Sequence, residues 1–95
     1  MADFIFLMHG DAKSQGDWPG YLAKLRATGK FEGGSAVGGG VLMRKTGVTP
    51  DVTKHITGYL IVEADDLAHA QALVIGNPVF EGGGAVEIRE LPRTD

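Results

Sequence analysis

The sequence predicts an α+β fold of the ferredoxin-like type: the order βαββαβ, a four-stranded antiparallel sheet and two helices on one face. Two short apolar stretches, at residues 3–9 and 56–64, are rich in β-branched or aromatic residues and indicate strands. Each is followed by a capped, helix-like pattern. The length of 95 residues and the apolar fraction of 43% predict one globular domain over residues 1–95.

The first half of the chain predicts a strand, a helix and a second strand. Residues 3–9 (DFIFLMH) form an apolar run that is too short for a helix and indicates a buried strand. Asp17 can then cap a helix that Gly29 can end. Between them, the apolar residues at helical spacing are Trp18, Tyr21, Leu22 and Leu25. Residues 31–45 favour extended structure, in which clustered glycines indicate a bulge or a close backbone approach.

The second half repeats this plan after a loop. Residues 46–54 are expected to form a loop or hairpin tip, and residues 56–64 (ITGYLIVEA) a strand. One of Asp65–Asp66 caps a second helix, and the stop signal for that helix is Gly76-Asn77-Pro78. Residues 85–91 (AVEIREL) alternate apolar and charged side chains and predict the last strand.

One face of the predicted sheet has no helix to cover it. In the third strand, Leu60 and Val62 point to one side while Tyr59 and Ile61 point to the other, so both sides are substantially apolar. Fifteen glycines also raise the entropy that folding must overcome in a small domain. We therefore expect two sheets to pack face to face in a homodimer; the alternative is an exposed sheet with scattered apolar residues.

Composition excludes several classes of function. The net charge is −3 and no basic stripe exists, so we expect no nucleic-acid partner. No apolar run approaches the length of a membrane helix, and the N-terminus lacks the positive start of a signal peptide. The chain has no cysteine, which excludes a disulfide framework and a thiol nucleophile. These absences predict a cytoplasmic protein with no membrane partner.

His9 and Asp11 are the candidate catalytic residues. In an extended chain, positions two apart point the same way, so the imidazole and the carboxylate would meet at the end of the first strand. A carboxylate beside an imidazole favours its charged form and orients it, as a general base requires. The alternative is that His9 ends the strand and Asp11 forms an Asx turn.

The candidate substrate-binding residues are Tyr21, Trp18, Ser35 and Arg89. Core packing is the alternative role for the two aromatic residues, although the Tyr21 hydroxyl would meet a ligand if the helix borders a pocket. His9, Asp11 and His55 are suitable metal ligands by type, but no spacing signature supports a metal site. Since no nucleotide-binding motif is present either, we predict no metal and no cofactor.

Several segments resemble YCII-related proteins, including their DGPF-type branch. They are Trp18–Leu25 (WPGYLAKL) with the glycines that follow, residues 58–67 and residues 77–92. The resemblance covers nearly the whole chain and implies a ferredoxin-like fold that forms a dimeric α/β barrel. It also implies enzymatic activity through a His–Asp pair. The histidine of the family's first helix is Tyr21 here, and residues 47–52 replace the Asp-Gly-Pro-Phe segment.

Our leading functional hypothesis is a small homodimer with a pocket between the sheet and the first helix. It would bind a small polar or aromatic metabolite and carry out lyase- or isomerase-like acid–base chemistry. His9 would be the base and Asp11 its orienting group, while Tyr21 and Arg89 would position the substrate. The alternative is a non-catalytic binding or protein-interaction module.

Overall fold

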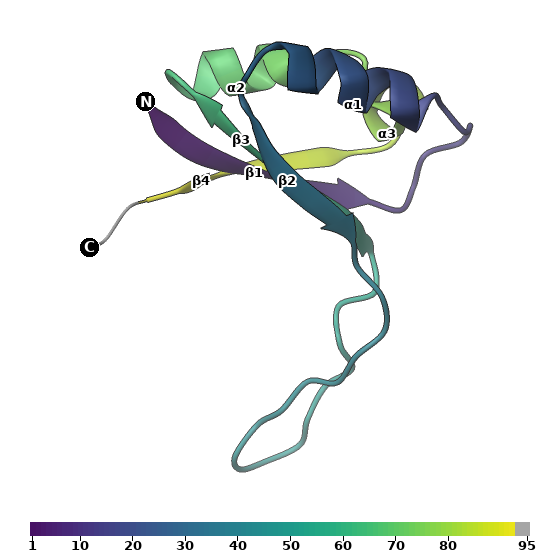
Figure 1. The fold of residues 1–95 in the computed structure, drawn as a ribbon. Coiled ribbons are helices and arrows are strands. Elements are labelled where there is room, and N and C mark those ends of the chain that lie inside the picture. The colour runs from purple at the N-terminus through teal and green to yellow at the C-terminus, as the bar shows by residue number, and fades with distance from the viewer. Residues whose placement is uncertain (93–95) are drawn as a thin grey trace.

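The chain folds as two layers, a sheet and a set of helices that lie on one of its faces (Figure 1). A computed structural model describes residues 1–92; the predicted domain of residues 1–95 thus includes three positions outside the described residues. The elements are β1 (Ala2–His9), α1 (Trp18–Ala27), β2 (Phe31–Ala36), β3 (Ile56–Ala64), α2 (Leu67–Val74), α3 (Pro78–Glu81) and β4 (Val86–Leu91). The strand order is β2-β3-β1-β4, and every neighbouring pair is antiparallel. The ferredoxin-like prediction is confirmed.

The two longer helices begin at acidic caps. The Asp17 carboxylate accepts a hydrogen bond from the Gly20 backbone N–H at 2.9 Å, and the Asp66 carboxylate accepts one from His69 N–H at 2.8 Å. Each bond satisfies a backbone donor that the first turn of a helix leaves free. The first helix ends before Gly29, whose φ of +72° is the left-handed conformation that ends many helices. Both predicted helices therefore form where the capping residues place them.

The predicted stop at Gly76-Asn77-Pro78 also starts a third helix, which the sequence analysis did not identify. Asn77 is completely buried, and its side-chain oxygen accepts from Val79 N–H at 2.9 Å and from Phe80 N–H at 3.2 Å. Pro78 occupies the first helical position, where a missing N–H costs nothing. Residues 76–78 thus provide both the stop signal that ends α2 and the start of the four-residue α3.

The core lies between the sheet and the helices. The buried apolar residues are Phe4, Phe6, Met8, Leu60, Val62 and Ala64 from the sheet, and Tyr21, Leu25, Ala70 and Val74 from α1 and α2. The alternation predicted for β3 is confirmed, since Leu60 and Val62 are buried whereas Tyr59 and Ile61 keep intermediate exposure on the other face. We call this helix-free side of the sheet the open face.

Residues 37–55 form a long arm between β2 and β3, where the sequence predicted extended structure up to residue 45. Val37 N–H still donates to the Thr57 carbonyl at 3.0 Å, but no strand forms between Ala36 and Ile56. Figure 1 shows this segment leaving the domain on the side of the sheet away from the helices. The strand prediction for residues 37–45 is wrong for the single chain, because this part of the chain has no neighbouring strand to pair with.

Candidate functional site

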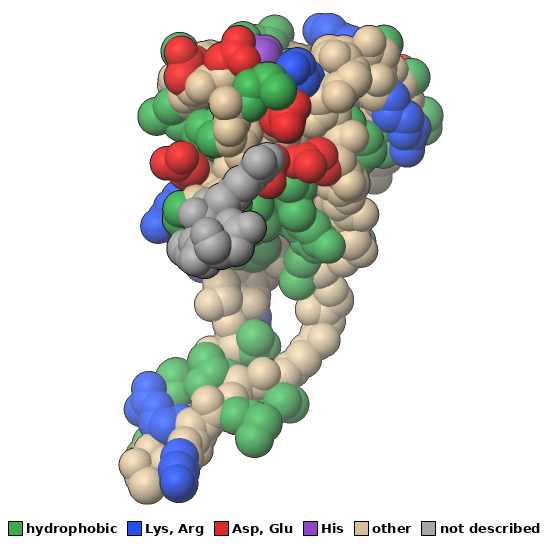
Figure 2. Space-filling model, turned by 60° about the vertical axis from the view of Figure 1, so that its left-hand side comes forward, with side chains coloured by type: hydrophobic (Ala, Val, Ile, Leu, Met, Phe, Trp, Pro, Cys, Tyr) green, Lys and Arg blue, Asp and Glu red, His purple; other side chains and the backbone are tan. Residues whose placement is uncertain are grey.

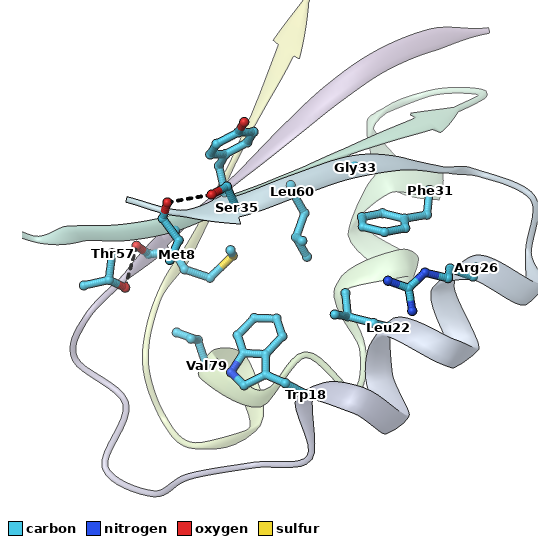
Figure 3. A pocket seen from close by; sticks show the side chains of 14 residues that line it. Met8, Trp18, Leu22, Arg26, Phe31, Gly33, Ser35, Thr57, Leu60 and Val79 are labelled. Carbon is cyan, nitrogen blue, oxygen red and sulfur yellow. Dashed lines mark hydrogen bonds between the residues drawn. The ribbon is translucent and has the colours of Figure 1, made fainter. Parts of the chain in front are cut away.

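An apolar cavity of about 540 Å³ lies between α1 and the β2–β3 edge of the sheet (Figure 3). Its apolar walls are the side chains of Met8, Trp18, Leu22, Phe31, Leu60 and Val79. Trp18 and Leu22 are four positions apart and so share one face of α1, next to the core-facing stripe of Tyr21 and Leu25. Small-molecule sites of proteins have this size and this apolar character.

Few polar side chains join this cavity, and one of them is charged. Arg26 follows Leu22 by one turn of α1, and its guanidinium carbon lies 5.6 Å from the centre of the Phe31 ring. The Ser35 hydroxyl donates to the Ala36 carbonyl at 2.9 Å, and the Thr57 hydroxyl lies 3.5 Å from the Met8 carbonyl. The cavity thus combines aromatic and aliphatic walls with one cation at its edge, while Ser35 and Thr57 alternate with the core-facing positions and place their hydroxyls on the open side of the sheet.

Gly34 lets β2 approach β3 closely beside the cavity. A Cβ atom at this position would collide with the Tyr59 carbonyl oxygen and lie 2.7 Å from the Leu60 side chain. The register of the β2–β3 pair also shifts between Phe31 and Gly33, which is the irregularity that the clustered glycines predicted. Any other residue at Gly34 would force the two strands apart at the cavity wall.

A second hollow of about 500 Å³ adjoins the first and shares Trp18 and Val79 with it. It is lined mainly by the loop between β1 and α1, which includes Lys13 and Gln15, and by His9 at the end of β1. The Trp18 side chain is therefore a wall of both spaces. His9 alternates with the buried Met8, so it contributes the end of β1 to this hollow while its imidazole points to the open face.

His9 pairs with a carboxylate from the last strand, which sequence analysis did not select as a site residue. Its Nε2 lies 3.2 Å from Glu87 Oε1, and Arg89 donates to the other oxygen of the same carboxylate at 3.1 Å. The hydrogen bond from Arg89 and then that from His9 lower the pKa of Glu87. The His55 ring stands edge-on to His9 with a centroid distance of 4.8 Å. These four residues form a polar cluster at one end of the open face.

Asp11 lies elsewhere and is not the hydrogen-bonding partner of His9. Its carboxylate accepts from the Ala85 backbone N–H at 2.9 Å, which ties the β1–α1 loop to the start of β4. The predicted pairing assumed extended chain from His9 to Asp11, but β1 ends at His9 and Gly10 N–H donates to the His55 carbonyl at 2.8 Å. The period-two alternation stops there, so the two side chains do not share a face.

The four predicted substrate-binding residues separate into three groups. Trp18 and Ser35 are among the residues that line the apolar cavity, but Ser35 pairs with Tyr59 and so its side chain is on the open face. Tyr21 is 5% exposed and belongs to the core, where its hydroxyl donates to the Leu73 carbonyl at 2.7 Å and burial raises its pKa. Arg89 is on the open face with Glu87. Tyr21 and Arg89 thus do not contact the cavity, because they project from other faces of α1 and the sheet.

The alternation of side chains along β4 is the sequence signal that could have identified Glu87 as a neighbour of His9. Glu87 pairs with Leu7 on β1, so it lies on the same face as His9, two positions further along β1. That inference needs the pairing of β1 with β4, which a single sequence does not display. Within residues 1–92, no three His, Asp or Glu side chains are placed to hold a metal ion, and no helix is long and apolar enough to cross a membrane.

The sequence of residues 8–94 matches the family of the YCII-related domain. The chain belongs to the YCII-related family. Among solved structures, this YCII-related chain is similar to the 5-chloro-2-hydroxyhydroquinone dehydrochlorinase of Burkholderia phenoliruptrix AC1100, determined in complex with 2,5-dihydroxybenzoquinone. The TM-score is 0.58 at 18% identity, over 99% of this chain and 96% of the other, so the two share the fold. No curated protein matches the sequence.

Proposed function

We propose that this protein binds a small aromatic or quinoid compound with polar ring substituents, in the cavity beside Trp18, and that it works as a homodimer. The observation that carries the proposal is the apolar cavity between α1 and the sheet, which Trp18 and Phe31 line and Arg26 borders. The dehydrochlorinase with the same fold binds 2,5-dihydroxybenzoquinone, a compound of this class.

The residues around the cavity suit such a ligand. Trp18 and Phe31 offer aromatic surfaces that favour stacked or edge-on contacts with a ring. Arg26, beside Phe31, would donate charge-assisted hydrogen bonds to an ionised ring oxygen. A flat, partly anionic molecule matches this combination better than an aliphatic or cationic one.

The His9–Glu87 pair is the best candidate for acid–base chemistry on the bound compound. Glu87 would orient the imidazole and stabilise its protonated form, the role that the sequence assigned to Asp11. His9 would then take a proton from a ligand carbon or hydroxyl that reaches the end of β1. This chemistry is separate from binding, because the imidazole of His9 lies with Glu87 on the open face and not in the apolar cavity.

The open face supplies the argument for a homodimer. Ile5 pairs with Ile61, and Leu7 with Tyr59, so four large side chains form an apolar stripe across the two central strands. Two such faces would pack as layers of a sandwich at a spacing of about 10 Å. A second copy would also cover the His9–Glu87 pair and exclude water from it.

Binding can be tested with the single tryptophan as the reporter. Adding 2,5-dihydroxybenzoquinone should change the fluorescence of Trp18, the only tryptophan in the sequence, and calorimetry should give the same Kd. Arg26→Gln should weaken binding roughly tenfold, the effect of losing one charge-assisted hydrogen bond. Lys24→Gln removes a cation from the same helix away from the cavity, and should leave the Kd unchanged. Equal effects of the two variants would contradict a ligand site at this cavity.

Catalysis is tested separately from binding. We expect chloride release from 5-chloro-2-hydroxyhydroquinone, or hydrogen–deuterium exchange into 2,5-dihydroxybenzoquinone, to fall by roughly a hundredfold or more in His9→Asn. Glu87→Gln should lower the same rate, and His69→Asn, a histidine on α2, should not. If the wild type binds the quinone but neither reaction exceeds the uncatalysed rate, the protein is a binding module for such compounds.

A further inference from the structure

The arm of residues 37–55 concentrates the exposed apolar side chains of the protein. Of the nine large hydrophobic residues that are exposed within residues 1–92, five belong to this segment: Val37, Val41, Leu42, Met43 and Val48. Met43 is 89% exposed and Val48 is 86% exposed. Single exposed apolar residues are ordinary on a protein surface, but a contiguous group marks an interaction surface.

The arm does not pack against the domain that carries it. Among the hydrogen bonds and ion pairs of the described chain, none joins residues 38–54 to the rest, whereas Arg44 donates to the Val48 carbonyl within the arm at 2.8 Å. The Cα radius of gyration is 14.8 Å, compared with about 12 Å for a compact domain of this length. The arm therefore stands out from the body with its apolar side chains uncovered.

The direction and charge of the arm indicate what it contacts. It extends on the helix-free side of the sheet, the side on which a second copy would pack (Figure 1). Hydrophobic and basic side chains gather on it in the space-filling view (Figure 2). The arm has three basic residues and one acidic residue, a net +2; the other six basic and eleven acidic residues give the rest of the chain a net −5. The arm is thus complementary in charge to the body of another copy of this chain.

We propose that the arm of each protomer docks on the body of a second copy, where residues 41–43 become buried and Arg44 and Lys45 lie near acidic side chains. The proposal rests on the homodimer of the proposed function and adds the contact that holds it. Docking of the arm would also affect the polar cluster, because His55, where the arm joins β3, contacts His9. The partner's contact with the arm would then fix the position of His55 beside the candidate base.

The absence of cysteine from the sequence permits a direct test by site-specific crosslinking. Met43→Cys labelled with a benzophenone maleimide should give, after irradiation, a covalent product of twice the 10.0 kDa chain mass. In a mixture of ¹⁵N-labelled and unlabelled protein, the crosslinked peptides should combine both isotopes. Ile75→Cys places the probe at an exposed apolar position of the body, and should give little of this product. A Met43→Cys probe that reacts only within its own chain would overturn the proposal.

A second experiment separates the arm from the open face. Replacing residues 39–54 by a short Gly-Ser turn should leave folding intact, because these residues make no hydrogen bond to the body, and should raise the dimer Kd roughly tenfold or more. Ile61→Glu places a charge in the apolar stripe and tests the face. If the shortened chain dimerises like the wild type while Ile61→Glu is monomeric, the arm proposal is wrong and the face-to-face dimer holds. If only the shortened chain is monomeric, the arm holds the dimer and the face does not.

Discussion

The imidazole of His9 and the carboxylate of Glu87, 78 positions apart in the sequence, meet on neighbouring strands with Nε2 3.2 Å from Oε1. Arg89 holds the second oxygen of that carboxylate at 3.1 Å, so Glu87 is fixed between a permanent cation and an imidazole. Such a carboxylate is negatively charged over a wide range of pH and is well placed to orient His9.

We predict that Arg89→Gln raises the pKa of Glu87 toward its ordinary value of 4.5, since the hydrogen bond from Arg89 is the largest cause of the lowered value. A lowered folded-state pKa contributes stability above the ordinary value, and that contribution is lost as pH falls through the folded pKa. The carboxyl ¹³C resonance of Glu87 in a pH titration measures the change. Lys24→Gln, which removes a cation far from Glu87, should leave the titration midpoint of Glu87 unchanged. An unchanged Glu87 midpoint in Arg89→Gln as well would contradict the Arg89–Glu87 ion pair.

Tyr21→Phe should destabilise the fold by about 1 kcal/mol at neutral pH, the usual cost of one intramolecular hydrogen bond, here to the Leu73 carbonyl. Burial raises the pKa of Tyr21 above 10.0, so its stabilising contribution is complete below that pH and is lost as pH rises through the folded pKa. Urea unfolding of both proteins at several pH values measures this difference. Because Tyr21 is outside the cavity, the Kd for 2,5-dihydroxybenzoquinone should not change. A large increase in Kd would show that Tyr21 contacts the ligand after all.

Asn77→Ala should lower the free energy of unfolding by about 1–3 kcal/mol, because it removes the buried cap of α3 and leaves two backbone N–H groups without their acceptor. Asp17→Ala removes an exposed cap at α1, where water replaces the lost acceptor, and should cost less. Chemical denaturation of the two variants gives the comparison. Equal losses would mean that the burial of Asn77 adds nothing to its capping role.

Gly34→Ala should destabilise the protein by about 1–3 kcal/mol, since the added methyl group collides with β3 and the strands must separate. It should also weaken ligand binding, because Gly34 lines the cavity. Gly39→Ala is the matched control: a Cβ there meets no atom within 4 Å, so stability and Kd should stay the same. Thermal unfolding and the Trp18 fluorescence titration measure both effects, and a stable Gly34→Ala variant would show that the close approach is not required.

Much of the fold was predictable because it depends on local signals. The caps at Asp17 and Asp66, the left-handed Gly29 and the period-two alternation of β3 all act within a few residues of chain. The candidate site was predictable only in part. Trp18 lines the cavity, whereas Tyr21 follows the core stripe of the same helix, and the orientation that separates them is set by how α1 packs on the sheet.

By itself, the sequence determined where the four strands and the two longer helices follow one another along the chain, the caps that begin those helices and the faces of the sheet. Propensity, capping and alternation are short-range properties of the chain. Only the tertiary structure decided that His9 meets Glu87 and not Asp11, that Trp18 stands between two hollows, and that residues 37–55 leave the domain. Each of these depends on which strands become neighbours, and strand pairing is a long-range choice made by packing the whole sheet against its helices.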